Sequence, residues 1–144
     1  MIKKVIRDVI INDATITADL ATYTFTTGST EPAVFTTNII PRDADFPAVI
    51  IDQSAGDMFG CRDKRGGELI IEVRVYDDKD KTEETIYDLA LNIWKLLDRV
   101  NIETRLNIEG YEDWGCQADP PIQQDDPDGY PGYLIRVRPR ILET

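Results

Sequence analysis

The sequence has no histidine, and it has only two cysteines in 144 residues. Without histidine the chain lacks the usual general base near neutral pH, the commonest metal ligand, and every Ser-His or Cys-His nucleophile system. Cys61 and Cys116 belong to no CxxC pair, which argues against zinc and thioredoxin-like sites. We expect two reduced thiols, one or both of them buried. Chemistry based on carboxylates, lysine or cysteine remains open.

Long apolar runs and nucleotide-binding motifs are missing as well. No run approaches the roughly 20 apolar residues that cross a bilayer, and the first residues lack the apolar core of a signal peptide. We therefore expect no membrane partner, and a location in the cytoplasm or in a particle assembled there. Gly56 and Gly60 are followed by Cys61-Arg62 where a phosphate-binding loop needs Gly-Lys. The sequence predicts no cofactor, no metal and no catalytic residue.

Acidic residues, by contrast, are abundant. The chain has 27 Asp and Glu against 16 Lys and Arg, for a formal net charge of -11. Such a surface repels phosphate backbones, so it disfavours non-specific binding to nucleic acid and would let DNA slide past without sticking. The hydrophobic fraction of 42% and the charged fraction of 30% are typical of soluble globular proteins. The length fits a single domain over residues 1–144.

An arm is predicted near the N-terminus. Ala21, Tyr23 and Phe25 alternate with threonines over residues 21–27, which indicates a half-buried strand. After a turn at residues 28–32, residues 33–40 are expected to return as a second strand. Residues 21–40 would then form a β-hairpin arm; the alternative is a long irregular loop.

The rest of the chain predicts an α+β fold. Apolar residues at helical spacing predict helices at residues 1–12 and from Asp80 to about residue 100. Glycines at 56, 60, 66 and 67 indicate a connecting loop over residues 56–67. We expect a mainly antiparallel (mixed) sheet of about four core strands, with the N-terminal helix and the long helix packed on it, plus the hairpin arm. Alternation and apolar runs place the core strands at residues 48–51, 68–76, 111–119 and 133–141.

An arginine stripe marks the last predicted strand. Arg136, Arg138 and Arg140 recur every second residue, so they share one face of the sheet. They could bind an acidic partner, phosphates or a neighbouring subunit, where arginine is enriched. The alternative is cross-strand pairing with Glu68 and Glu72, worth a few tenths of a kcal/mol per pair.

The predicted glycine-rich loop holds two further candidate contacts. Arg62, Lys64 and Arg65 are a compact basic cluster that could face DNA phosphates or a partner, although a solvated tip is the simpler interpretation. Met58 and Phe59 would be apolar residues in an exposed loop, and could contact another chain.

Two more features of the sequence are candidate sites, one for an interface and one for a metal ion. Trp94 lies beside the apolar stripe of the long helix, so it belongs either to the core edge or to an interface. The acidic stretch at residues 125–129 suggests calcium, but it lacks the flanking helices and the distal Glu of an EF-hand. Since Asp-Gly is a common turn signal, we interpret it as a β-turn.

The order of elements resembles the tail-terminator (tail-completion) proteins of long-tailed bacteriophages. The resemblance lies in the Ile-Pro…Phe-Pro-Ala-Val-Ile segment at residues 39–51, the strand at 68–76, the helix after Asp80 and the strand at 133–138. It implies an α+β fold without catalytic residues. It also implies a homohexameric ring, located in the tail or neck of a virion assembled in the host bacterial cytoplasm. Its partners would be itself, the tail tube protein and the head-tail connector or neck proteins, with DNA passing through the lumen without sequence-specific binding.

Other functions remain open on the sequence alone. A head-closure or neck adaptor protein would share the same surroundings in a virion. A carboxylate-dependent hydrolase or nuclease would use the abundant acids, although their even scatter singles none out. A small regulatory binding module is a further alternative.

Overall fold

The computed structural model describes residues 2–61, 64–82, 84–98 and 111–143, and for residues 54–61, 64–65, 111–114 and 142–143 it describes the backbone alone. The helices are α1 (Ile2–Ile11), α2 (Ala14–Asp19) and α3 (Glu84–Leu97). The strands are β1 (Thr22–Thr24), β2 (Thr30–Pro32), β3 (Val34–Phe35), β4 (Ala48–Cys61), β5 (Lys64–Tyr76), β6 (Tyr111–Ala118), β7 (Ile122–Gln123) and β8 (Gly132–Glu143).

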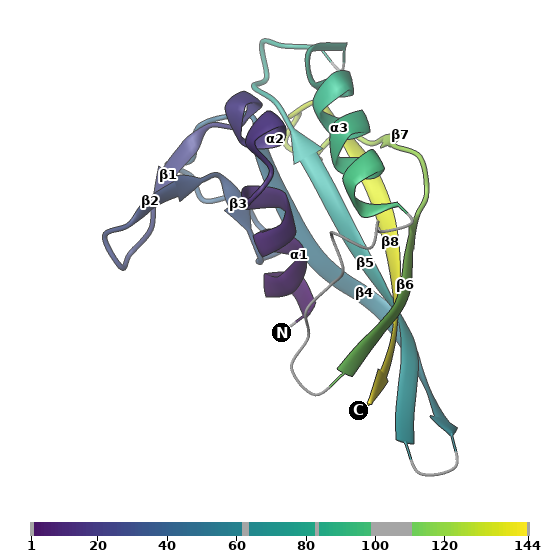
Figure 1. The fold of residues 1–144 in the computed structure, drawn as a ribbon. Coiled ribbons are helices and arrows are strands. Elements are labelled where there is room, and N and C mark those ends of the chain that lie inside the picture. Colours follow the sequence, from purple (N-terminus) through teal and green to yellow (C-terminus); the bar gives the residue numbers. More distant parts are fainter. Residues whose placement is uncertain (1, 62–63, 83, 99–110, 144) are drawn as a thin grey trace.

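The main sheet has six strands, in the order β3-β4-β5-β8-β6 with β7 also paired to β8. β3 runs parallel to β4, and the other strand pairs of this sheet are antiparallel. The helices α1 and α3 lie on one face of the sheet (Figure 1). We call the other side the open face. The predicted α+β class, with a mixed sheet and the two helices packed on it, is confirmed.

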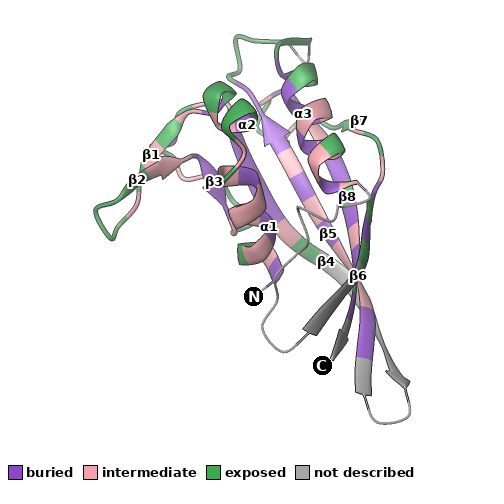
Figure 2. Cartoon of the chain, viewed as in Figure 1, coloured by how far each residue is buried: buried purple, intermediate pink, exposed green. Residues whose placement is uncertain are grey.

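The main core lies between these helices and the sheet. Ile6 of α1, Ile93 of α3 and Val73 of β5 are all 0% exposed, as the helical and two-residue spacings predicted. Figure 2 shows buried residues on α1, on α3 and along the central strands that these helices cover. Burying an aliphatic side chain of this size stabilises a fold by roughly 1.5–3 kcal/mol, so this layer supplies most of the driving force for folding.

A second, aromatic cluster holds the β1–β2 hairpin against the molecule. The rings of Tyr23 and Phe35 meet edge to face with centroids 5.1 Å apart, and Tyr23 and Phe25 do so at 5.0 Å. Arg7 of α1 lies over the Phe25 ring, 5.3 Å from its centroid, and its Nε donates to the Val34 carbonyl oxygen at 2.8 Å. The β1–β2 hairpin is therefore held against α1 and β3 by contacts within the same chain.

The arm differs from the prediction in its second half. The hairpin pairs residues 22–24 with residues 30–32, so its return strand lies in the predicted turn, and the predicted return strand at 33–40 is wrong. Val34 and Phe35 instead join the main sheet beside β4. The reason is tertiary: the aromatic cluster buries Phe35, and a strand pair with the sheet satisfies its backbone, which local alternation alone does not reveal.

The predicted loop at residues 56–67 is also wrong. β4 continues to Cys61 and β5 begins at Lys64, and the two pair residue by residue through this stretch. Met58 lies opposite Gly67 and Phe59 opposite Gly66, so each large residue faces one without a side chain. Ladder hydrogen bonds need only the backbone, which glycine supplies as well as any residue. A glycine-rich composition therefore did not prevent pairing.

Candidate functional site

The arginine stripe lies on the open face, and each of its members is paired within the chain. The Arg136 Nε atom lies 3.8 Å from Glu72, and the Arg140 Nε atom lies 3.0 Å from Glu68, in the register that places each acid opposite its arginine. Arg138 pairs with Asp119 at 2.5 Å. The cross-strand alternative with Glu68 and Glu72 thus describes two of the three arginines.

These ion pairs leave the arginine heads accessible. The side chains of Arg136, Arg138 and Arg140 are 49%, 39% and 59% exposed. Exposed pairs of this kind contribute about 0–1 kcal/mol each, so their stabilising effect is small. The stripe is an ion-paired surface whose guanidinium groups can also reach a neighbouring molecule. Its role as an interface stays a prediction.

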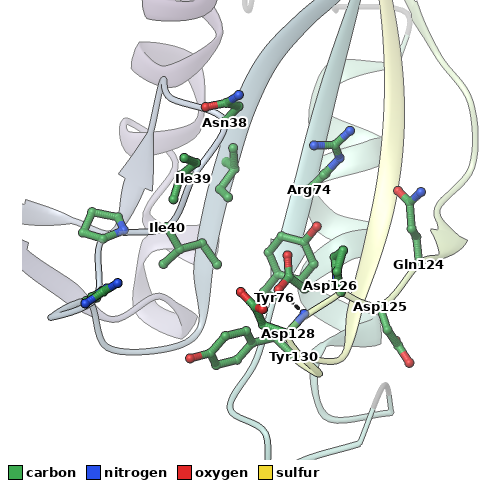
Figure 3. Close-up of a pocket in the computed structure, with 14 residues that line it drawn as sticks. Asn38, Ile39, Ile40, Arg74, Tyr76, Gln124, Asp125, Asp126, Asp128 and Tyr130 are labelled. Carbon is green, nitrogen blue, oxygen red and sulfur yellow. Dashed lines mark hydrogen bonds between the residues drawn. The ribbon is translucent and has the colours of Figure 1, made fainter.

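A pocket opens on the same face, at the end of β5. Its volume is about 610 Å³, and its floor is formed by Ile50, Arg74 and Tyr76. One wall is the segment at residues 38–42 and the other is the loop at residues 124–130. Figure 3 shows Ile39 and Ile40 on one side, Arg74 and Gln124 on the other, and Tyr76 between them. Three stretches that lie far apart in the sequence therefore meet here.

Local interactions hold the two walls in place. The Phe46 and Tyr130 rings stack with centroids 4.6 Å apart, which joins the chain just after the first wall to the second wall. In the loop, the Asp128 backbone N–H donates to the Asp126 carboxylate at 2.9 Å, and Gly129 follows with a φ of 97°, which favours glycine. The β-turn interpretation of residues 125–129 is confirmed, and the turn also forms a pocket wall.

Tyr76 is the most unusual side chain in the pocket. It is only 4% exposed, yet its hydroxyl makes no hydrogen bond with any described residue. Burial raises the pKa of the Tyr76 hydroxyl, although Arg74 partly opposes this rise. Arg74 itself donates to Glu72, a carboxylate that it shares with Arg136. The phenol is therefore held neutral, with an unused donor and acceptor at the pocket floor.

The remaining predicted contacts lie in the β4–β5 hairpin. Met58 and Phe59 belong to β4, whereas Lys64 and Arg65 begin β5; only their backbones are described. Arg62 lies outside the described residues. The structure thus places these candidates on one long hairpin rather than in a loop, and it leaves their contacts as predictions.

Trp94 belongs to the core edge. It is half-buried and packs against the main core, and its indole N–H donates to the Ala118 carbonyl oxygen at 2.9 Å. The Ala118 N–H in turn donates to the Asp98 carboxylate at 3.0 Å. Two hydrogen bonds to the Ala118 backbone therefore join the C-terminal end of α3 to β6. The side chain of Cys116 is buried. The side chain of Cys61 lies outside the description.

Neither a metal centre nor a membrane span is found in the described part of the chain. No three His, Cys, Asp or Glu residues among the described ones are grouped so that they could hold a metal ion. None of the described helices is both long and apolar enough to cross a bilayer. The features left for function are therefore surfaces: the pocket, the arginine stripe and the β4–β5 hairpin.

Comparison with known proteins gives a likeness of fold. The chain is similar to one chain of a structure described as the virion of a native gene transfer agent (GTA) particle, with a TM-score of 0.67 and 12% sequence identity. The similarity covers 97% of this chain and 93% of that one. No protein-family model matches the sequence, and no curated protein matches it. The likeness thus extends over nearly the whole fold, without close sequence similarity.

Proposed function

We propose that this chain is a structural protein of a phage-like virion. It forms a ring at the head-proximal end of the tail tube, where it ends tube polymerisation and joins the tail to the head connector. The observation that supports this most is the fold, which is similar to a virion protein over 97% of the chain. The order of elements, which resembles the tail-terminator family, supports the narrower role.

The far end of the sheet gives a physical reason for assembly. We define the sheet extension as residues 57–61, 64–68, 111–113 and 140–143, which pair with one another across four strands. In the described part of the chain no helix lies over it, as Figure 1 shows. A sheet needs a buried apolar face to be stable in water. Neighbouring subunits would provide that cover, and identical head-to-tail contacts close into a ring when the rotation allows.

Charge is compatible with this position. A net charge of -11 repels the DNA backbone, so DNA can pass through a lumen lined by such subunits without sticking. The number six comes from the family resemblance. Enzymatic activity is not expected, and hydrolase and nuclease assays with Mg²⁺, Mn²⁺ or Zn²⁺ should stay at background. Turnover that a single Asp or Glu substitution abolishes would contradict this.

Tail assembly with and without the chain tests the role. Loss of a terminator leaves tube growth unchecked, so we expect tubes of variable or excessive length that do not join heads. Loss of a neck adaptor would instead give tails of normal length beside unattached heads. Normal-length tails in the absence of the chain would therefore reject the terminator role in favour of the adaptor.

A variant pair tests the assembly surface. We expect Phe59→Ser, in the sheet extension, to remain folded by circular dichroism and to fail to join tails. The matched control is Tyr87→Ser, since Tyr87 is 44% exposed on α3, away from the extension. If both variants assemble normally, the extension is not the subunit contact.

A further inference from the structure

The pocket on the open face has features that neither folding nor the proposed ring explains. Its floor holds Tyr76, which is 4% exposed and whose hydroxyl lacks a hydrogen-bond partner among the described residues. A hydroxyl on an otherwise buried ring is available to hydrogen-bond a molecule that enters the pocket. The hydroxyl is turned into a hollow of about 610 Å³. The hydroxyl oxygen is not sealed off from solvent, so water or a group of an incoming molecule can supply its partner there.

The rim of the pocket indicates the charge of that partner. Asp125, Asp126 and Asp128 line it, and none of them forms an ion pair with a described residue. Asp125 and Asp126 accept hydrogen bonds from backbone N–H groups, which shape the loop but do not neutralise it. The four arginines of the open face, by contrast, are all ion-paired, although Arg74 and Arg136 share Glu72. The loop wall of the pocket therefore carries three carboxylates that have no ion-pair partner among the described residues.

The cations nearest to the rim are engaged elsewhere or lie apart. Arg74 on the floor is paired with Glu72. Lys79 lies over the Tyr130 ring, 4.9 Å from its centroid, and Arg42 lines the opposite wall. Neither Lys79 nor Arg42 comes within ion-pair distance of the three carboxylates. The unmatched carboxylates therefore favour an incoming cation.

The first wall indicates that the partner is not a simple ion. Ile39 is 71% exposed and lies beside Ile40 on the pocket wall, as Figure 3 shows. An exposed aliphatic side chain at the mouth of a polar hollow is a contact for another apolar group. A lysine or arginine next to an aliphatic residue can contact both walls. The charged head can meet the carboxylates of the loop, while its methylene stem and the aliphatic neighbour can pack on the isoleucines.

We propose that this pocket binds an extended segment of another protein, with a lysine or arginine in the hollow and an aliphatic side chain on Ile39. The cationic head meets the carboxylates of Asp126 and Asp128, and the Tyr76 hydroxyl accepts a hydrogen bond from it. The pocket lies at the end of β5, whereas the sheet extension includes its start, about 40 Å away at 3.3 Å per residue. The pocket and the sheet extension are therefore separate surfaces, and the segment comes from the neighbour that lies at the pocket. Only the identification of that neighbour as a virion protein rests on the proposed function.

Short peptides test the pocket chemistry without any tails. The probes are acetylated, amidated Ala-Ile-Lys-Ile-Ala and its counterparts with norleucine or glutamate in place of lysine, titrated into the ¹⁵N-labelled full chain and followed by NMR. We expect the lysine peptide to shift the amide signals of Ile39 and Gly129 with a Kd at least about tenfold below that of the norleucine peptide, as a charged hydrogen bond provides. The glutamate peptide should not bind.

Two variants and a control locate the effect. Asp126→Asn with Asp128→Asn keeps an oxygen acceptor in the loop but removes two charges, and it should weaken lysine-peptide binding at least about tenfold. Tyr76→Phe should weaken it as well. Asp88→Asn, at an exposed position on α3, should leave it unchanged. Equal binding of all three peptides, no shift with the lysine peptide, or equal weakening by Asp88→Asn would overturn the proposal. None of these outcomes depends on whether the chain forms a ring on tails.

Discussion

The substitution Ile93→Ala tests the layer between α3 and the sheet. Ile93 is 0% exposed and belongs to the main core cluster. The change removes three carbons, and at about 0.8 kcal/mol for each buried methylene the lost transfer energy is about 2.4 kcal/mol. The cavity left behind adds to this, so the total destabilisation should be about 2–5 kcal/mol. At this chain length the melting temperature should fall by roughly 4–20 °C.

Urea denaturation followed by circular dichroism gives the unfolding free energy. The slope with urea should match that of the unmodified chain, since the surface exposed on unfolding is nearly unchanged. Lys95→Ala is the control, because Lys95 is exposed on the same helix, and its effect should stay within about 0.5 kcal/mol. If the two variants lose equal stability, the helix face has been assigned incorrectly.

Three further predictions concern particular contacts. Gly132→Ala should destabilise the fold by about 1–3 kcal/mol, because an added Cβ would lie 2.7 Å from the Val75 carbonyl oxygen and against the Tyr76 ring; an unchanged urea midpoint would contradict this. Asp13→Ala should cost about 1 kcal/mol, because the Asp13 carboxylate accepts from the Ile16 N–H at 3.0 Å at the start of α2, and the exposed Asp19 serves as the Asp19→Ala control. Burial raises the pKa of Tyr76 in the folded chain, so this tyrosine ionises first in the unfolded chain, and stability should fall as pH rises above about 10. The urea midpoint of Tyr76→Phe should therefore fall less than that of the unmodified chain between about pH 8 and 11. An equal fall in both proteins would show that Tyr76 is not the group responsible.

The periodic parts of the fold could be predicted from the sequence. The spacing of Ile2, Ile6 and Ile10 specifies the buried side of α1, and the alternation around Val73 specifies that of β5. Such patterns are local, because one face of each element meets the core. The pairing of Glu72 with Arg136 also followed, since both lie on one face of neighbouring strands.

Features that depend on distant partners could not be predicted. Residues 56–67 look like a loop because their glycines lack side chains, and only the register with the facing strand shows that they pair. Asp119 as the partner of Arg138 requires the positions of β6 and β8 together. The pocket requires three separate stretches and the buried Tyr76. The sequence identified its acidic turn correctly, but it gave no sign of the hollow beside it.

Electron microscopy of tails that carry the chain tests whether it forms a ring at the end of the tube. The reconstruction counts the copies of this fold and locates them along the tail. We expect a closed ring of identical subunits, six in the case that the family resemblance implies, at the head-proximal end of the tube, with the sheet extension in contact with a neighbouring subunit. A single copy, or copies located away from the tube end and neck, would contradict the account.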